Sequence, residues 1–130
     1  MIVVDASVLA VALGDDGPDG DKARARLSGE DLAAPELVDL EVLSVWRRHV
    51  AIGQMPPRRA DLAIADLTQV PLQRATHGPL LHRSWELRDN LSVYDACYVA
   101  LAELLEAIMV TADRRIAGAP GLRCVVDVVK

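Results

Sequence analysis

Short apolar runs that end beside an acidic residue constrain this chain more than any other feature. The run over residues 2–4 directly precedes Asp5, and the run over residues 107–110 is separated from Asp113 by two residues. Short apolar runs of this kind are typical of strands buried in a parallel sheet. Carboxylates are almost never buried unless they are paired or bound to metal. Acids in these positions therefore indicate a shared partner.

Segments with helical spacing separate these strand-like runs. The apolar pattern predicts strands at residues 2–4, 32–34, 70–72, 107–111 and 123–128. It predicts helices at residues 7–13, 22–27, 58–67, 79–87 and 92–105, and one that begins at Pro35 and ends near Gly53. Residues 14–21, rich in Asp and Gly, are predicted to form a loop. Alternating strands and helices imply parallel βαβ units, an α/β fold built as a three-layer α/β/α sandwich.

Composition narrows the classes of function. The 130 residues fit one domain, residues 1–130, and the net charge of −5 argues against a general nucleic-acid-binding protein. Cys97 and Cys124 lie in apolar runs and are interpreted as core residues. No signal peptide and no apolar stretch of membrane-spanning length is visible, so a cytoplasmic protein without membrane contact is expected.

The predicted topology brings four acids to one edge of the sheet. Asp5 and Asp113 follow strands, and open parallel sheets bind ligands at the carboxyl ends of their strands. The returning helices begin at that edge, and Asp95 lies in the first turn of one of them. Glu41 lies about a turn and a half into another, with its side chain tilted toward the helix N-terminus.

Four converging carboxylates suit Mg²⁺ or Mn²⁺, which prefer oxygen ligands. Such an ion activates water and neutralises charge on a leaving oxygen, so the site predicts metal-assisted phosphodiester hydrolysis. The three histidines have no zinc-type spacing with the cysteines, and no Ser-His-Asp triad is found.

Helix capping is the alternative interpretation of three of these acids. Ser92 and Asp95 fit a capping box, with Ser92 as the N-cap and Asp95 three residues later. Asp5 and Asp113 each follow a strand and would also serve as N-caps. Capping explains each acid singly, whereas the predicted fold favours a common metal site.

At four places the chain resembles the PIN-domain ribonucleases, and most closely the VapC-type toxins of bacterial toxin–antitoxin pairs. The resemblance covers nearly the whole chain and is carried by residues 3–7 (VVDAS), 35–48, 93–102 (VYDACYVALA) and 111–115 (TADRR). Each fragment is weakly specific alone, and their order and spacing make the match specific.

The resemblance implies a five-stranded parallel sheet and Mg²⁺-dependent endoribonuclease activity, with Mn²⁺ as a substitute ion. It assigns catalysis and metal binding to Asp5, Glu41, Asp95 and Asp113. It gives Ser7 and Thr111 supporting hydrogen bonds within the acidic cluster. Helical periodicity alone does not separate Glu41 from Asp39, and the family pattern selects Glu41.

The expected partners also follow from the resemblance: an RNA substrate of the tRNA or rRNA class, a VapB-type antitoxin and a second copy of the chain. Arg114 and Arg115 are candidates for contacts with RNA phosphate or an antitoxin carboxylate, and a solvated turn is the alternative.

Rival functions lack residues that they need. A haloacid-dehalogenase-like phosphatase has a second Asp two residues after the first, where this chain has Ser7. A receiver domain needs a Lys late in the sheet, and the only lysines are Lys22 and Lys130. A non-catalytic PIN-like scaffold remains the alternative, although it would not need the four acids.

Overall fold

A five-stranded parallel sheet forms the centre of the computed structural model, which describes residues 1–129. The strands follow the spatial order β3-β2-β1-β4-β5. Their bounds are β1 (Ile2–Val4), β2 (Leu32–Pro35), β3 (Leu72–Ala75), β4 (Ile108–Thr111) and β5 (Val126–Val128). All four pairings are parallel, which confirms the expected five-stranded parallel sheet.

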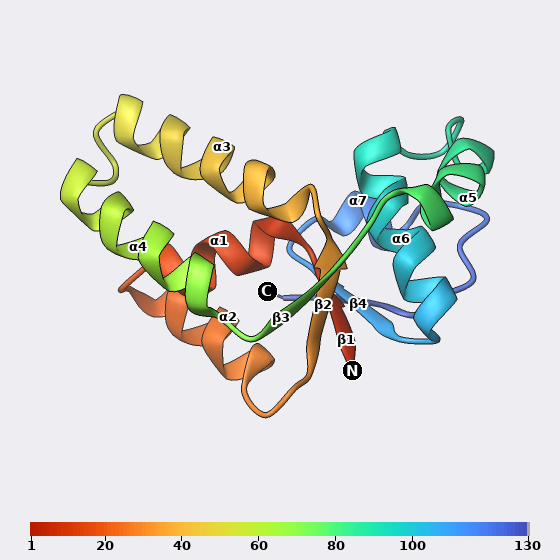
Figure 1. Ribbon diagram of the computed structural model, residues 1–130, viewed down its shortest axis with the longest axis horizontal. Helices are drawn as coiled ribbons and strands as arrows, with labels where there is room; N and C mark the ends of the chain where they lie inside the picture. Colours follow the sequence, from red (N-terminus) through yellow and green to blue (C-terminus); the bar gives the residue numbers. More distant parts are fainter. Residues whose placement is uncertain (130) are drawn as a thin grey trace.

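Helices cover both faces of the sheet, as expected for an α/β/α sandwich. Figure 1 shows α1 to α4 on one side of the sheet and α5 and α6 on the other, and α7 packs against β5. The bounds are α1 (Ala6–Gly14), α2 (Pro18–Leu27), α3 (Val38–Ala51), α4 (Pro57–Gln69), a 3₁₀ turn η1 (Gly78–Leu80), α5 (Leu81–Glu86), α6 (Val93–Leu105) and α7 (Arg114–Ala117).

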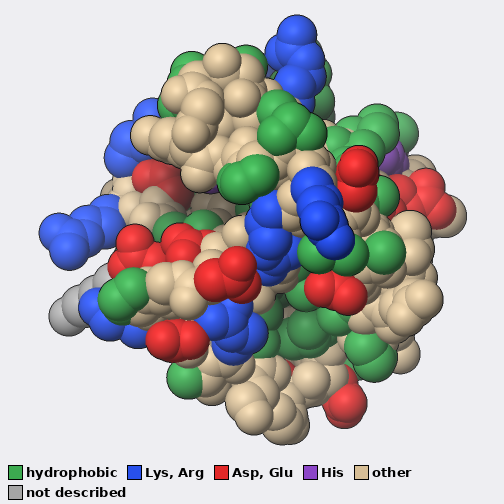
Figure 2. Space-filling model, turned by 90° about the vertical axis from the view of Figure 1, so that its left-hand side faces the viewer, with side chains coloured by type: hydrophobic (Ala, Val, Ile, Leu, Met, Phe, Trp, Pro, Cys, Tyr) green, Lys and Arg blue, Asp and Glu red, His purple; other side chains and the backbone are tan. Residues whose placement is uncertain are grey.

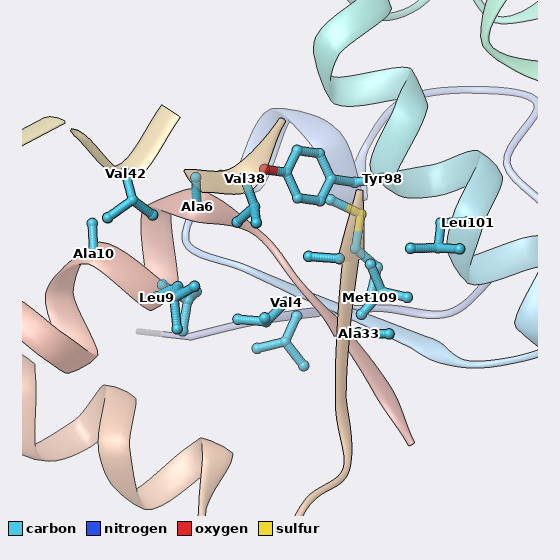
Figure 3. Close-up of a cluster of buried hydrophobic side chains, with 14 of the residues drawn as sticks. Val4, Ala6, Leu9, Ala10, Ala33, Val38, Val42, Tyr98, Leu101 and Met109 are labelled. Carbon is cyan, nitrogen blue, oxygen red and sulfur yellow. The ribbon is translucent and has the colours of Figure 1, made fainter. Parts of the chain in front are cut away.

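The hydrophobic core lies around the two central strands, β1 and β4, and consists mainly of aliphatic side chains. Val3 and Val4 of β1 pair in register with Met109 and Val110 of β4, and all four are fully buried. Branched side chains suit strands that are covered on both faces. Tyr98 of α6 supplies the largest fully buried side chain, and Figure 3 shows its hydroxyl directed toward Val38 at the start of α3.

Helix α2 begins four residues earlier than the sequence pattern predicted, because residues 18–21 are helical and not part of a loop. Pro18 occupies the first turn, where its fixed φ suits a helix and its missing N–H costs nothing. Asp19 and Asp21 follow it, where the helix dipole favours acids. Gly20 is buried against the backbone carbonyl of Asp15, where no larger residue would fit.

Helix α3 begins later than predicted. Pro35 does not open it but ends β2, paired in register with Ala75. Glu41 consequently lies in the first turn of α3, closer to the carboxyl edge of the sheet than the sequence indicated. The rotation of α3 is held by buried Trp46, whose Nε1 donates to the Ala10 carbonyl of α1 at 3.1 Å.

The two edge strands also differ in extent from the prediction. β3 covers residues 72–75 instead of 70–72, and β5 covers only 126–128 of the predicted 123–128. Each edge carries a charged residue in an ion pair with a helix. Arg74 of β3 bonds Asp39 of α3 at 2.7 Å, and Asp127 of β5 accepts from Arg26 of α2 at 2.7 Å.

The acidic stretch between α1 and α2 is partly neutralised by nearby arginines. Asp16 pairs with Arg59 at 3.0 Å, and Asp21 pairs with Arg24 at 2.7 Å. Figure 2 shows acidic and basic side chains side by side on this end of the molecule. None of the helices within residues 1–129 is long and apolar enough to cross a bilayer.

We predict that Gly20→Ala lowers the free energy of unfolding by about 1–3 kcal/mol, the usual cost of overpacking. An added Cβ would lie 1.8 Å from the Asp15 carbonyl oxygen, so the backbone has to move. Urea denaturation measures the change. Gly78→Ala is the matched control, because its Cβ meets no heavy atom within 4 Å. Equal losses in both variants would contradict this packing argument.

Candidate functional site

Asp5 is the buried centre of the acidic cluster. It lies between β1 and α1 with only 7% of its surface exposed. Its Oδ2 accepts hydrogen bonds from Thr111 Oγ1 at 2.7 Å and from Ser7 Oγ at 2.9 Å. Although Asp5 occupies the N-cap position of α1, its side chain makes no capping hydrogen bond, so the capping interpretation is wrong for this residue.

The hydroxyls of Ser7 and Thr111 extend this network into the turn after β4. Ser7 Oγ accepts from the Ala112 N–H at 3.1 Å, and Thr111 Oγ1 accepts from the Asp113 N–H at 3.1 Å. Each hydroxyl therefore donates to the Asp5 carboxylate and accepts from a backbone amide. The network fixes the segment that carries Asp113 relative to Asp5.

Glu41, not Asp39, faces the cluster from α3. Its Oε1 accepts from the hydroxyl of buried Tyr98 at 2.7 Å. Burial raises the pKa of Glu41, and the charges of Asp5 and Asp95 raise it further, against the lowering effect of the Tyr98 hydroxyl. Asp39 binds Arg74 through both carboxylate oxygens, at 2.7 and 2.9 Å. The structure thus separates two acids that helical periodicity left ambiguous.

Asp95 reaches the cluster from the first turn of α6. Ser92 caps this helix, as predicted, because its Oγ accepts from the Asp95 N–H at 3.1 Å. Burial raises the pKa of the Asp95 carboxyl, and the neighbouring charges of Asp5 and Asp113 raise it as well. Capping and membership of the acidic cluster therefore coexist in this turn.

Asp113 is bound by an arginine of its own turn. Its Oδ1 accepts from the backbone N–H of Arg115 at 2.9 Å, which caps α7 as the alternative interpretation predicted. The Arg115 guanidinium donates to Oδ1 at 3.1 Å and to Oδ2 at 2.7 Å. This pairing lowers the pKa of Asp113, in contrast to Glu41 and Asp95.

The four acids gather at the carboxyl edge of the sheet, but their side chains do not converge on one point. Within residues 1–129, no three His, Cys, Asp or Glu side chains are arranged to hold a metal ion as they stand. Asp95, Asp113 and Arg115 line a common cavity of about 390 Å³ with Ser92 and Asn90. Tyr98 donates a hydrogen bond to Glu41, and Arg115 donates one to Asp113. These two acids are therefore held by protein groups near the other two acids.

The chemistry of the donor set suits a hard divalent cation. All four side chains offer carboxylate oxygens, the ligands that Mg²⁺ and Mn²⁺ prefer. Both hydroxyls of the Asp5 network bind Oδ2, so Oδ1 is left without a hydroxyl partner. Burial first, and the neighbouring carboxylates second, raise the pKa of Glu41 and of Asp95, so their ionised forms are costly here. A cation relieves that cost.

Tyr98 contacts the acidic cluster, and the sequence reasoning did not single it out. It lies three residues after Asp95 on α6, so both side chains share one face of the helix. Tyr98 lies within an apolar helical segment, which indicates ordinary core packing for its ring. A buried Tyr hydroxyl needs a hydrogen-bond partner, and this requirement could have indicated a contact with one of the acids.

Comparison with known proteins finds similar chains along nearly the whole length. Residues 2–122 match the family model of the PIN domain. The chain is 40% identical to a VapC ribonuclease of Mycobacterium bovis, over 99% of this chain and 98% of the relative. It is 37% identical to ribonuclease VapC1 of Mycobacterium tuberculosis, over 98% and 97% of the two chains.

Solved structures show the same fold at lower identity. PAE2754 from Pyrobaculum aerophilum aligns with a TM-score of 0.73 at 23% identity, over 98% of this chain and 83% of that one. VapBC2 from Rickettsia felis, crystallised with a DNA fragment from its promoter, aligns with a TM-score of 0.66 at 12% identity over 100% of both chains.

We predict that Glu41→Gln raises the melting temperature of the metal-free protein at pH 7.5 by about 2–4 °C. The folded pKa of Glu41 is above its unfolded value, so the ionised group costs stability at neutral pH. This cost disappears as pH falls to the unfolded pKa, so the advantage of the variant should vanish near pH 4. Differential scanning calorimetry in EDTA measures both effects.

Asp39→Asn is the matched control on the same helix. It weakens the ion pair with Arg74, so its melting temperature should fall by about 3 °C at pH 7.5. A Glu41→Gln protein that melts at or below the wild-type temperature at pH 7.5 would refute the charge penalty.

Proposed function

Because the chain belongs to the PIN domain family, we propose that it is a metal-dependent endoribonuclease toxin of the VapC type. The observation that carries the proposal is the cluster of acids around Asp5, held by Ser7 and Thr111. The names of its relatives support it, since proteins 40% and 37% identical over nearly the whole chain are called VapC ribonucleases.

The four acids have different tasks in this proposal. Asp5 and Asp95 bind the ion directly. Asp5 keeps one carboxylate oxygen without a hydroxyl partner, and Asp95 lies close enough to feel the charge of Asp5. Glu41 and Asp113 bind it directly or through water, or position the attacking water. Bound Mg²⁺ or Mn²⁺ would orient the phosphate and activate a water molecule. In-line attack on the RNA phosphodiester then leaves a 5′-phosphate and a 3′-hydroxyl.

The proposed partners are an RNA of the tRNA or rRNA class, a VapB-type antitoxin and a second copy of the chain. The Rickettsia felis neighbour, named as a VapBC complex, supports the antitoxin. Exposed apolar side chains support self-association, among them Trp85 of α5 and Tyr94 of α6, with 62% and 61% of their surfaces accessible. We propose that an Arg or Lys of the antitoxin approaches the acids, where it would replace the charge of the metal.

We predict that the purified protein cuts total cellular RNA into discrete fragments with Mg²⁺ or Mn²⁺. EDTA, Asp5→Asn and Asp95→Asn should each lower cleavage at least about 100-fold, because each removes the ion or one of its ligands. Asp39→Asn, on α3 but bonded to Arg74, should keep wild-type cleavage. End-mapping of the fragments identifies the target.

Two results would contradict this function. Products with a 2′,3′-cyclic phosphate would exclude attack by water on the phosphodiester. No cleavage together with no binding of Mn²⁺ in calorimetry would favour the scaffold, and would leave Asp113 and Ser92 with capping roles alone.

Tyr98→Phe tests the buried hydrogen bond to Glu41. The ring stays in the core, so the protein should remain folded while kcat falls about tenfold, as for one lost hydrogen bond to a charged group. The Tyr98 hydroxyl lowers the pKa of Glu41, so its removal should shift the acid limb of the pH–rate profile to higher pH. A profile that does not move would reduce Tyr98 to a packing role.

A further inference from the structure

We propose that Arg115 is an internal cation that holds the Asp113 carboxylate until metal binds, and that it then moves to a phosphate of the RNA. The proposal rests on the proposed metal-dependent nuclease function and adds a residue that changes partners during binding. It assigns Arg115 two successive ligands, a carboxylate of its own chain and a phosphodiester of the substrate.

Arg115 contacts both oxygens of the Asp113 carboxylate. The guanidinium Nε and one terminal nitrogen reach both carboxylate oxygens, at 3.1 and 2.7 Å, and the backbone N–H adds a contact at 2.9 Å. Both oxygens of Asp113 therefore already carry a cationic partner with which a metal ion would compete.

The ion pair between Arg115 and Asp113 opens easily because Arg115 is exposed to water. The Arg115 side chain is 87% exposed, whereas that of Asp113 is 26% exposed. Exposed ion pairs are weak, because water solvates both groups and the arginine loses rotamer freedom. A divalent ion attracted by Asp5 and Asp95 as well therefore outcompetes one guanidinium. The backbone N–H of Arg115 can keep capping α7 when the side chain leaves.

A released Arg115 guanidinium can bind a phosphate of the RNA. Once released, the Arg115 guanidinium remains beside the acids, because Arg115 lines the cavity of about 390 Å³ that Asp95 and Asp113 also line. Guanidinium groups bind phosphate oxygens with two parallel hydrogen bonds. A chain of net charge −5 with clustered acids needs a local cation to accept a polyanion. Arg115 supplies one within the site.

Calorimetric titration of the purified protein with Mn²⁺, in the absence of RNA, tests whether Arg115 and the metal ion compete for Asp113. Arg115→Gln should bind Mn²⁺ about threefold to tenfold more tightly than the wild type, because it removes a competing cation from Asp113. Arg114→Gln is the matched control: it removes the same charge one residue away. The guanidinium of Arg114 pairs with no acid within residues 1–129, so its Mn²⁺ affinity should stay within about twofold.

Steady-state cleavage of a mapped RNA target tests the transfer to phosphate. At saturating Mg²⁺, Arg115→Gln should raise KM for RNA about tenfold, and Arg115→Lys should recover part of that loss because it keeps the charge. Tighter Mn²⁺ binding with weaker RNA affinity is a combination that a merely structural arginine would not produce.

The outcomes separate this inference from the function on which it rests. Equal or weaker Mn²⁺ binding by Arg115→Gln, with normal cleavage by the wild type, overturns the inference alone. Tighter Mn²⁺ binding with an unchanged KM overturns the transfer to phosphate. Absence of Mn²⁺ binding in the wild type overturns the metal site and the inference together.

Discussion

The hydrogen bond from Thr111 Oγ1 to Asp5 Oδ2 is the contact on which the site depends. It joins the ends of two central strands across 106 positions of sequence, at 2.7 Å and out of contact with solvent. Parallel pairing of β1 with β4 brings the two residues to the same edge. Ser7 adds a second donor, so the charge of Asp5 is tolerated at the bottom of the cluster.

Around this bond, side chains that stabilise the fold also determine the pKa values of the acids in the site. The buried Tyr98 ring reaches from α6 toward the start of α3, while its hydroxyl donates to Glu41. Ser92 begins α6 and thereby directs Asp95 toward Asp5. Electrostatic cost accumulates in the carboxyls of Glu41 and Asp95, whereas Arg115 removes it from Asp113. The same side chains therefore store repulsion that a bound cation would release.

Sequence reasoning predicted the layers and the positions of the acids because both follow from local patterns. Apolar runs marked the strands, and parallel connections bring their ends to one edge. The reasoning was wrong about the start of α2, although Pro18 in the first turn is itself a local signal. Helical periodicity left Glu41 and Asp39 unresolved, because contacts distant in sequence, with Tyr98 and Arg74, separate them. The pairing of Arg115 with Asp113 depends on the side-chain rotamer of Arg115, which cannot be predicted from the spacing of residues in the sequence.

The charged residues on the two outer strands have a consequence for association. An open sheet exposes unpaired backbone groups along its edges, and another chain can add a strand there. Here both edge strands are short, and each carries a charge bonded to a helix, Arg74 on β3 and Asp127 on β5. Adding a strand would bring a foreign backbone against those ion pairs. The two edges of this sheet therefore offer little to a chain that would add a strand.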